Sequence, residues 1–161
     1  LGPMTNPAGA NVQVLGVFAR ELIEPLAQVL GKLGSRRALV VHGEGNLDEL
    51  TVTGETHIAE LQNGQVSTYT ITPEELGLPR AKLADLRGGA TAEESASQLR
   101  TVLGGEKGAK RDIVLLNSAA ALMAGGLCGD LKTGITIAAD VIDSGRAAEK
   151  LASLVNFTHG K

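Results

Sequence analysis

Aromatic residues and cysteine are scarce in this sequence of 161 residues. Phe18, Tyr69 and Phe157 make up the aromatic 2%, and tryptophan is absent. So few rings provide no stacking platform for nucleic-acid bases, and aliphatic side chains must fill the core. The single cysteine, Cys128, cannot form an internal disulfide, which is consistent with a reducing compartment. We interpret Cys128 as a small buried hydrophobic residue near a helix end, with a reactive thiol as the alternative.

A strong charge of either sign and long apolar runs are also lacking. The 15 basic and 18 acidic residues give a net charge of −3, which gives no indication of the basic surface that nucleic-acid phosphates require. No run of about 18 apolar residues occurs, and no basic leader precedes an apolar stretch. We therefore expect no nucleic-acid partner, no membrane segment and a cytoplasmic location. With 43% hydrophobic and 20% charged residues, the composition is that of a globular domain with a sizeable core.

The first seven residues form a proline-containing loop that cannot be regular structure. Pro3 and Pro7 flank Asn6, and proline removes a backbone donor and fixes φ. The loop is either an ordinary connector or a stiff segment that presents Asn6 or backbone groups to a ligand. Because no initiator methionine precedes it, we interpret the start as a cut within a longer chain. Residues 1–161 would then form a single α/β domain, the C-terminal portion of that chain.

Apolar patterning predicts a strand, a helix and a second strand near the start of the chain. The strands are expected at Asn11–Phe18 and Arg37–His42, apolar runs whose length and composition favour burial on both faces. Between them, Arg20–Leu33 carries apolar residues at helical spacing and is followed by Gly34, a typical terminator. Such a unit makes a parallel pair of strands with a right-handed crossover.

An antiparallel hairpin is predicted after this unit. Thr56–Ile71 alternates polar and apolar residues around Asn63-Gly64, a pair typical of a two-residue type I′ turn. The expected fold class is therefore α/β, with a mostly parallel sheet, this hairpin and flanking helices. The expected helices after the hairpin are one capped by Thr91 that runs to about Leu103, a buried one at Asp112–Ala124, and two amphipathic ones at Leu131–Asp143 and Arg146–Phe157, the last capped by Ser144.

A glycine-rich loop with two adjacent acids follows the second predicted strand. Asp48 and Glu49 lie at its end, and ligands of parallel α/β sheets bind at the carboxyl ends of strands. Carboxylates are the ligands that Mg²⁺ takes when it also holds substrate phosphates. Adjacent acids are common on solvated loops too, so this pair by itself leaves both readings open. His42, at the strand end, either faces the loop or is structural, and His57 and His159 are expected at the surface.

Nucleophilic hydrolysis and zinc chemistry find no support in the sequence. It contains no Ser/His/Asp spacing, no paired cysteines and no HExxH-type cluster, which such sites require. The functional interest therefore falls on the acidic loop and on the proline-containing start.

Five segments stand out together: LGPMTNPA at 1–8, VHGEGNLDEL at 41–50, RGG at 87–89, RDIVLLNSAAAL at 111–122 and IDSGRAAEKL at 142–151. In order and spacing they resemble the C-terminal half of anthranilate phosphoribosyltransferases, and the likeness covers essentially the whole sequence. The resemblance implies a fold of the nucleoside phosphorylase/phosphoribosyltransferase type. It also implies Mg²⁺ as cofactor, and anthranilate and phosphoribosyl pyrophosphate as substrates, in tryptophan biosynthesis.

The resemblance assigns roles to four residues. Asp48 and Glu49 would hold Mg²⁺ on the pyrophosphate of phosphoribosyl pyrophosphate, and Gly2 and Pro3 would line the anthranilate channel. No catalytic acid or base is expected, because the anthranilate amine displaces pyrophosphate in a step that depends on positioning and on charge stabilisation.

The resemblance also implies that much of the active site lies outside these residues. The family's glycine-rich phosphate loop, its Lys-His-Gly-Asn segment and the arginine for the anthranilate carboxylate belong to the N-terminal half. We therefore expect this chain to be inactive alone, to need that half as its partner, and to form a homodimer when complete. An uncovered apolar face is expected on Asp112–Ala124 and at the sheet edge. The alternatives are a pyrimidine nucleoside phosphorylase, a paralogous phosphoribosyltransferase and a non-catalytic folding fragment.

Overall fold

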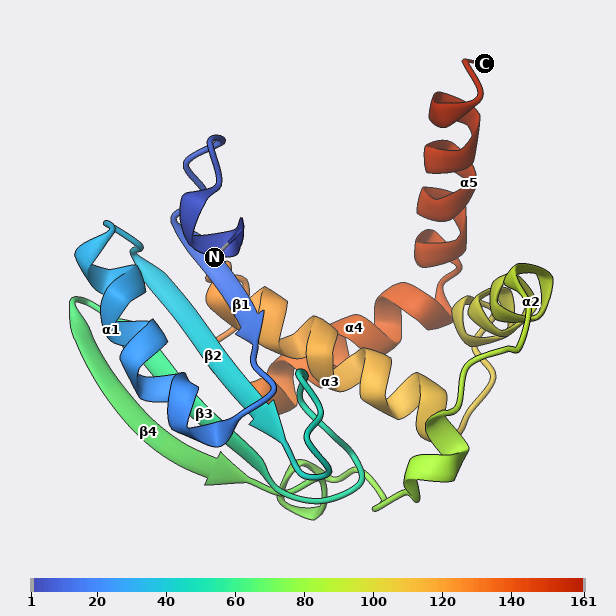
Figure 1. The fold of residues 1–161 in the computed structure, drawn as a ribbon. Helices are drawn as coiled ribbons and strands as arrows, with labels where there is room; N and C mark the ends of the chain where they lie inside the picture. Colours follow the sequence, from blue (N-terminus) through green and yellow to red (C-terminus); the bar gives the residue numbers. More distant parts are fainter. Residues whose placement is uncertain (1, 161) are drawn as a thin grey trace.

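The computed structural model describes residues 2–160, in which helices cover both faces of a four-stranded sheet (Figure 1). The strands are β1 (Val12–Gly16), β2 (Arg37–Gly43), β3 (Thr56–Gln62) and β4 (Gln65–Ile71), and they lie in the order β1-β2-β3-β4. Only β1 and β2 are parallel, while β3 pairs antiparallel with both β2 and β4. The α/β class and the hairpin are confirmed, but the sheet is mixed rather than mostly parallel. The reason is that a loop, not a helix, joins β2 to β3, so the chain reverses direction.

The two parallel strands differ in burial. In β2 the side chains alternate between two cores: Ala38 and Val40 belong to one cluster, and Leu39 and Val41 to the other. This strand is buried on both faces, as predicted. The strand β1 lies at the edge of the sheet and is only half-buried, with Val14 37% exposed. The prediction of a fully buried first strand was wrong because β1 has a neighbour on one side only.

Helices α1 and α3 cover opposite faces of the sheet. The helix α1 (Ile23–Lys32) follows the 3-10 turn η2 (Arg20–Leu22) and packs on β2, β3 and β4. Gly34, with φ of +89°, follows it in the left-handed conformation that glycine adopts readily. On the other face, α3 (Ala109–Ala124) packs on β1 and β2, and α4 (Leu131–Asp143) packs on α3. Gly134 of α4 allows this close approach, because an added Cβ would lie 2.8 Å from the Cβ of Ala119.

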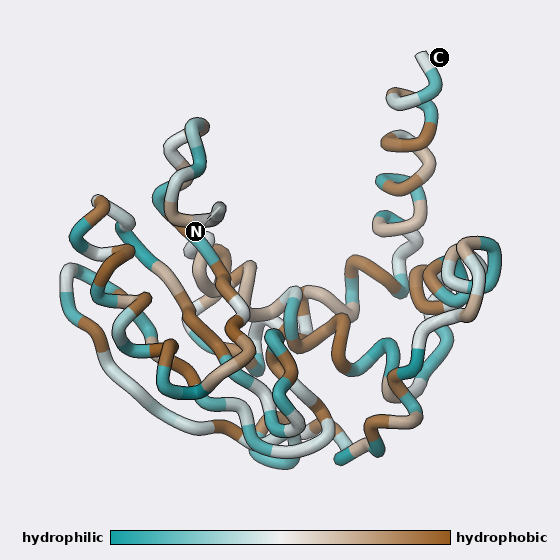
Figure 2. The backbone as a smooth tube through the Cα atoms, viewed as in Figure 1, coloured by the Kyte–Doolittle hydropathy of each residue, from teal (hydrophilic) through white to brown (hydrophobic). Residues whose placement is uncertain are grey.

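Two helices stand away from the sheet. The helices α2 (Ala92–Leu103) and α5 (Arg146–Thr158) contact α4 and each other, and Figure 1 shows α5 projecting from the body of the molecule. Figure 2 shows apolar colour where α1 and α3 meet the sheet and recurring apolar bands along α5. The expected uncovered face on Asp112–Ala124 was wrong, since α4 covers it. Several exposed large apolar side chains instead lie on the outlying helices: Leu99, Leu154, Val155 and Phe157.

Turns and caps follow the sequence with one exception. Asn63 (φ +52°) and Gly64 (φ +77°) turn the hairpin with two positive φ angles, as a type I′ turn requires. The Thr91 hydroxyl accepts the Glu94 N–H at 3.1 Å and caps α2. Ser144, predicted to cap α5, instead closes α4, and Gly145 is the N-cap. That position has φ of +80°, which favours glycine over serine.

Short 3-10 turns complete the chain: η1 (Gly2–Thr5), η3 (Glu74–Leu76) and η4 (Leu83–Leu86). The prediction that the first seven residues contain no regular structure was wrong, because proline is tolerated in the first turn of a helix, where its missing N–H needs no partner. Within residues 2–160, no helix combines the length and apolar character needed to cross a membrane.

Candidate functional site

The acidic pair lies on a tight loop that follows the carboxyl end of β2. Gly43 and Leu47 exchange two backbone hydrogen bonds, of 2.8 and 3.1 Å, which bring the loop back onto the strand end. Gly45 and Asn46, both with positive φ, make the turn between them. The loop therefore returns the following acids to the carboxyl end of the parallel pair, the position that the sequence predicted for a ligand site.

The backbone of Asp48 lies directly on β1. A Cβ added to Gly16, the last residue of β1, would overlap the carbonyl oxygen and carbon of Asp48. The obstacle is backbone, which cannot rotate out of the way as a side chain can. Only glycine at position 16 therefore allows the loop to rest in this place.

Asn117 of α3 holds the loop from the other side. Its Oδ1 accepts the Leu50 N–H at 3.0 Å, and its Nδ2 donates to the Leu50 carbonyl at 2.8 Å. Its Nδ2 also lies 3.0 Å from the Ile113 carbonyl, one turn earlier in α3. Sequence reasoning missed Asn117, although an amide among leucines and alanines is a signal, because a polar group on a packed helix needs partners.

The two carboxylates are exposed, and the negative charge of Asp48 acts on Glu49. Partial burial, and then the negative charge of Asp48, raise the pKa of Glu49 above its ordinary value. The Nδ2 of Asn117 lies 3.5 Å from Oε2 of Glu49, at the outer limit of a hydrogen bond. Glu49 therefore lacks a strong positive partner among the described contacts, and a cation beside the pair would compensate its charge.

The donor set fits Mg²⁺ better than a metal held by protein alone. Both side chains offer only carboxylate oxygens, the hard ligands that Mg²⁺ prefers. Among residues 2–160, no group of three or more His, Cys, Asp or Glu side chains could hold a metal ion. Mg²⁺ commonly binds through one or two carboxylates and completes its shell with water and substrate phosphates. The pair therefore suits a metal shared with a phosphorylated ligand.

The three histidines differ in burial and in their contacts. His42 is buried, and its Nδ1 lies 2.9 Å from the Val17 carbonyl, which ties the end of β2 to the segment after β1. His57, its cross-strand partner, is only 15% exposed and lies 2.9 Å from the Thr70 hydroxyl. The surface position predicted for His57 was wrong because its side chain is largely buried, beside Thr70 of β4. His159 is exposed, as predicted.

The other predicted site residues lie near the start of the chain. Gly2 is exposed in η1, and no atom lies within 4 Å of the position its Cβ would take. Pro3 belongs to η1, but its side chain lies outside the described residues. Met4 packs against the core on the α1 side and shares a small pocket with Asn11, which precedes β1. The structure thus places the chain around Met4 at the amino end of the parallel pair, a strand length of roughly 17 Å from the acidic loop.

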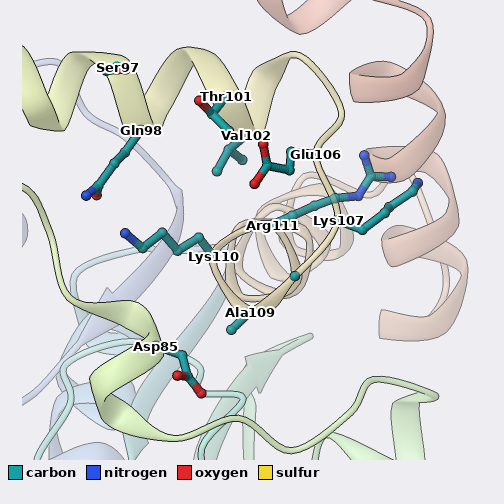
Figure 3. Close-up of a pocket in the computed structure, with 11 residues that line it drawn as sticks. Asp85, Ser97, Gln98, Thr101, Val102, Glu106, Lys107, Ala109, Lys110 and Arg111 are labelled. Atoms are coloured by element: carbon teal, nitrogen blue, oxygen red, sulfur yellow. The ribbon is translucent and has the colours of Figure 1, made fainter.

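A separate pocket of about 440 Å³ lies where α3 begins, between α2, α3 and η4. Figure 3 shows Lys110 extending into this space and Arg111 pointing away from it, on the same side as Lys107. The Arg111 guanidinium donates to both carboxylate oxygens of Asp143, at 2.6 and 2.9 Å. This region joins α3 to α4 by a paired charge and is distinct from the acidic loop.

Comparison with known proteins identifies the family. Residues 1–148 match the model described as the a/b domain of a glycosyl transferase family. The chain belongs to this glycosyl transferase family.

Its relatives are anthranilate phosphoribosyltransferases. Those of Desulfotalea psychrophila and Methanosarcina acetivorans are 57% and 54% identical over 98% of this chain, which covers 45% and 42% of their lengths. The solved structure of the Thermus thermophilus enzyme is 46% identical, with a TM-score of 0.88 over 97% of this chain and 46% of that one. The Saccharomyces cerevisiae enzyme in complex with PRPP and Mg is 26% identical, with a TM-score of 0.82 over 94% and 44%. The chain therefore spans less than half the length of these relatives.

Within this glycosyl transferase domain, the structure assembles one coherent group from distant parts of the sequence. Gly16 of β1 and Asn117 of α3 meet the loop of Asp48 and Glu49. The segment of Gly2 and Pro3 is not part of that group. The acidic loop is consequently the best-defined candidate site in the described residues.

Proposed function

We propose that this chain is the C-terminal part of an anthranilate phosphoribosyltransferase, which transfers the phosphoribosyl group to anthranilate and releases pyrophosphate in tryptophan biosynthesis. The observation that carries the proposal is the 57% identity to an anthranilate phosphoribosyltransferase over 98% of the chain. The acidic loop supports it independently, since an exposed pair of carboxylates at the carboxyl ends of β1 and β2 suits a metal bound to a phosphorylated substrate.

Asp48 and Glu49 are the proposed Mg²⁺ ligands. The Saccharomyces cerevisiae relative described with PRPP and Mg supports this choice of ligand and metal. When bound, Mg²⁺ would supply positive charge to offset the negative charge that builds on the departing pyrophosphate. Neither carboxylate needs to move a proton, because the amine nucleophile requires placement against the anomeric carbon rather than activation.

Gly2 and Pro3 are proposed to line the anthranilate site. The open space around Gly2 supports a contact through its backbone, because no atom of the described residues beyond its chain neighbours lies within 4 Å of the position its Cβ would take. Their separation from the acidic loop suits a nucleophile that approaches the anomeric carbon from the side opposite the departing pyrophosphate.

The complete enzyme would require more than these 161 residues. We propose that they form a single α/β domain, the C-terminal portion of a longer chain. The N-terminal half of that chain would carry the phosphate loop and the carboxylate-binding arginine. A complete protein of this kind would be a homodimer in the cytoplasm. The share of the relatives' length that this chain matches, between 42% and 47%, supports a partial site.

Replacing both acids in the full-length enzyme tests this proposal. The Asp48→Asn, Glu49→Gln double variant should fold normally, because both side chains are exposed on a loop. Its Mg²⁺-dependent turnover of phosphoribosyl pyrophosphate and anthranilate should fall by about 10²-fold or more, since an electrostatic element of the transition state is lost. A matched control replaces Asp140 by Asn and Glu149 by Gln, two exposed acids on α4 and α5. Parent-like rates for the double variant at limiting Mg²⁺ would remove the pair from the mechanism, and turnover of a pyrimidine nucleoside instead would favour a phosphorylase.

A further inference from the structure

The acidic loop is fixed at two points by residues outside it. We propose that Gly16 and Asn117 are positioning residues that set Asp48 and Glu49 in the arrangement that binds the divalent cation. This inference rests on the proposed function, which supplies the role of the cation. It goes further by assigning the two residues of the chain that shape the site without touching the metal.

The contact at Gly16 fixes Asp48 through its backbone. The strand end of β1 and the carbonyl of Asp48 approach so closely that a methyl group on Gly16 would occupy the place of the carbonyl. The backbone at Gly16 is held in turn by its pairing with Val41 in β2. Any side chain at position 16 would therefore move the loop rather than the strand, and with it the Asp48 carboxylate.

The contact at Asn117 fixes Glu49 through the next residue. The amide of Asn117 engages both the N–H and the carbonyl of Leu50, as a neighbouring strand would do. Leu50 is fully buried in the core between α3 and the sheet, so the loop cannot slide at this point. The side chain of Glu49, one residue earlier, therefore extends from a backbone position that is held in place.

The hydrogen bonds of Asn117 also explain why Glu49 stays available to a ligand. A side-chain amide has two N–H groups, and its two short contacts are with the carbonyls of Leu50 (2.8 Å) and Ile113 (3.0 Å). Glu49 lies farther away, at 3.5 Å. The carboxylate is thus held near α3 without being consumed by a strong hydrogen bond, and its oxygens remain free for a cation.

The test uses the full-length enzyme and two substitutions at position 117. Asn117→Leu removes both bonds to Leu50 at similar volume, whereas Asn117→Asp keeps an oxygen for the Leu50 N–H. Amide hydrogen exchange, measured without metal on peptides that contain Leu50, should accelerate about tenfold in Asn117→Leu and less in Asn117→Asp, which keeps the bond from the Leu50 N–H but loses both bonds donated by Nδ2. Asn156→Asp, the same change at an exposed position of α5, is the matched control.

Metal binding gives the second readout. Free Mn²⁺, counted by electron paramagnetic resonance with no substrate present, should show an affinity about fivefold or more weaker in Asn117→Leu than in the parent. In the assay, the Mg²⁺ concentration for half-maximal rate should rise by a similar factor, while kcat at saturating Mg²⁺ stays within about threefold. Loss of an interaction that only positions ligands is recovered at high metal concentration, as mass action requires.

Gly16→Ala provides an independent arm if Asn117→Leu does not fold. It should weaken Mn²⁺ binding while leaving exchange at Leu50 close to the parent, because Asn117 is intact. Gly129→Ala is its control, since no atom lies within 4 Å of the added methyl group.

The outcomes separate the inference from the proposed function. Parent-like Mn²⁺ affinity in both folded Gly16 and Asn117 variants would overturn the inference, as would unchanged exchange at Leu50 in Asn117→Leu. The inference would also be overturned if the Asp48→Asn, Glu49→Gln variant bound Mn²⁺ as tightly as the parent does. A parent that binds Mn²⁺ through these acids but transfers no phosphoribosyl group would refute the proposed function alone, and the Mn²⁺ comparison would still decide the inference.

Discussion

Arg111 shows how a single buried charge can join two helices. Its side chain is only 3% exposed, and its guanidinium donates in bidentate fashion to Asp143 of α4. The Lys107 ammonium adds a third bond to the same carboxylate at 3.3 Å. Because a buried guanidinium cannot lose its charge, it needs this partner. The bonds from Arg111, and then those from Lys107, lower the pKa of Asp143 below its ordinary value.

This lowered pKa predicts acid sensitivity of the α3–α4 contact. The unfolded chain, with an aspartate pKa of about 3.9, binds a proton before the folded chain does as the pH falls. The contribution of Asp143 to the free energy of unfolding is therefore present at neutral pH and is lost as the pH falls below about 4. In urea denaturation between pH 7 and 2.5, Asp143→Asn should lower the midpoint at pH 7 and flatten its decline below pH 4.

Asp140→Asn, an exposed change on the same helix, is the control and should follow the parent throughout. An Asp143→Asn variant whose midpoint declines as steeply as the parent's below pH 4 would show that the ion pair does not couple to folding.

The acidic residues of the candidate site could be predicted from the sequence, but the residues that hold their loop could not. Asp48 and Glu49 could be found because their chemistry and their position after a strand are both local features of the sequence. Gly16 and Asn117 could not, because their roles depend on contacts with a loop 32 and 67 residues away along the chain. Local patterns describe which residues share a strand or helix, but not which backbone a glycine or an amide will meet.

At the scale of elements, composition and periodicity located most helices and strands but not the strand directions. The helix α4 begins and ends at the predicted residues, and α2 ends as predicted at Leu103. The antiparallel pairing of β2 with β3 was missed because the loop between them carries no period that reveals its path. The exposure of β1 was missed because a strand at the edge and one in the centre can have the same apolar composition.

The close packing of α4 on α3 depends on Gly134. Gly134→Ala should destabilise the protein, although alanine normally favours a helix over glycine by roughly 0.5–1 kcal/mol. The added methyl group would lie 2.8 Å from the Ala119 Cβ and 3.0 Å from its carbonyl oxygen, so the helices must separate. We expect the free energy of unfolding to fall by about 1–3 kcal/mol, measured by chemical denaturation.

Gly31→Ala in α1 is the matched control. Its methyl group would meet only the end of the Leu61 side chain, at 3.1 Å, which can turn aside. Its free energy of unfolding should stay within about 1 kcal/mol of the parent. Equal stability of the Gly134 variant and the parent would mean that α4 has room to shift away from α3.

At the scale of the whole molecule, apolar surface remains on the side away from the sheet. A groove of about 650 Å³ runs between α2 and α5, and its lining includes Leu99, Leu103, Leu151 and Val155. Phe157, near the end of α5, is 82% exposed. Exposed apolar surface of this kind favours association with another polypeptide. The edge strand β1 adds backbone groups that have no neighbouring strand on one side among residues 2–160.

The chain by itself is therefore predicted to fold but to show no anthranilate phosphoribosyltransferase activity. The reaction requires the ribose 5-phosphate, the pyrophosphate and the anthranilate to be held together, and such positioning can contribute about 7–11 kcal/mol to the lowering of the barrier. In the proposed site, the acidic loop would supply only the pyrophosphate side of this arrangement. A separately produced N-terminal half of a full-length relative should restore Mg²⁺-dependent product formation in proportion to the complex formed. Size-exclusion chromatography with light scattering would measure the complex, and the Asp48→Asn, Glu49→Gln chain would be the control that associates without activity. A monomeric 161-residue chain that is active without any partner would refute this prediction and would require a complete site within these residues.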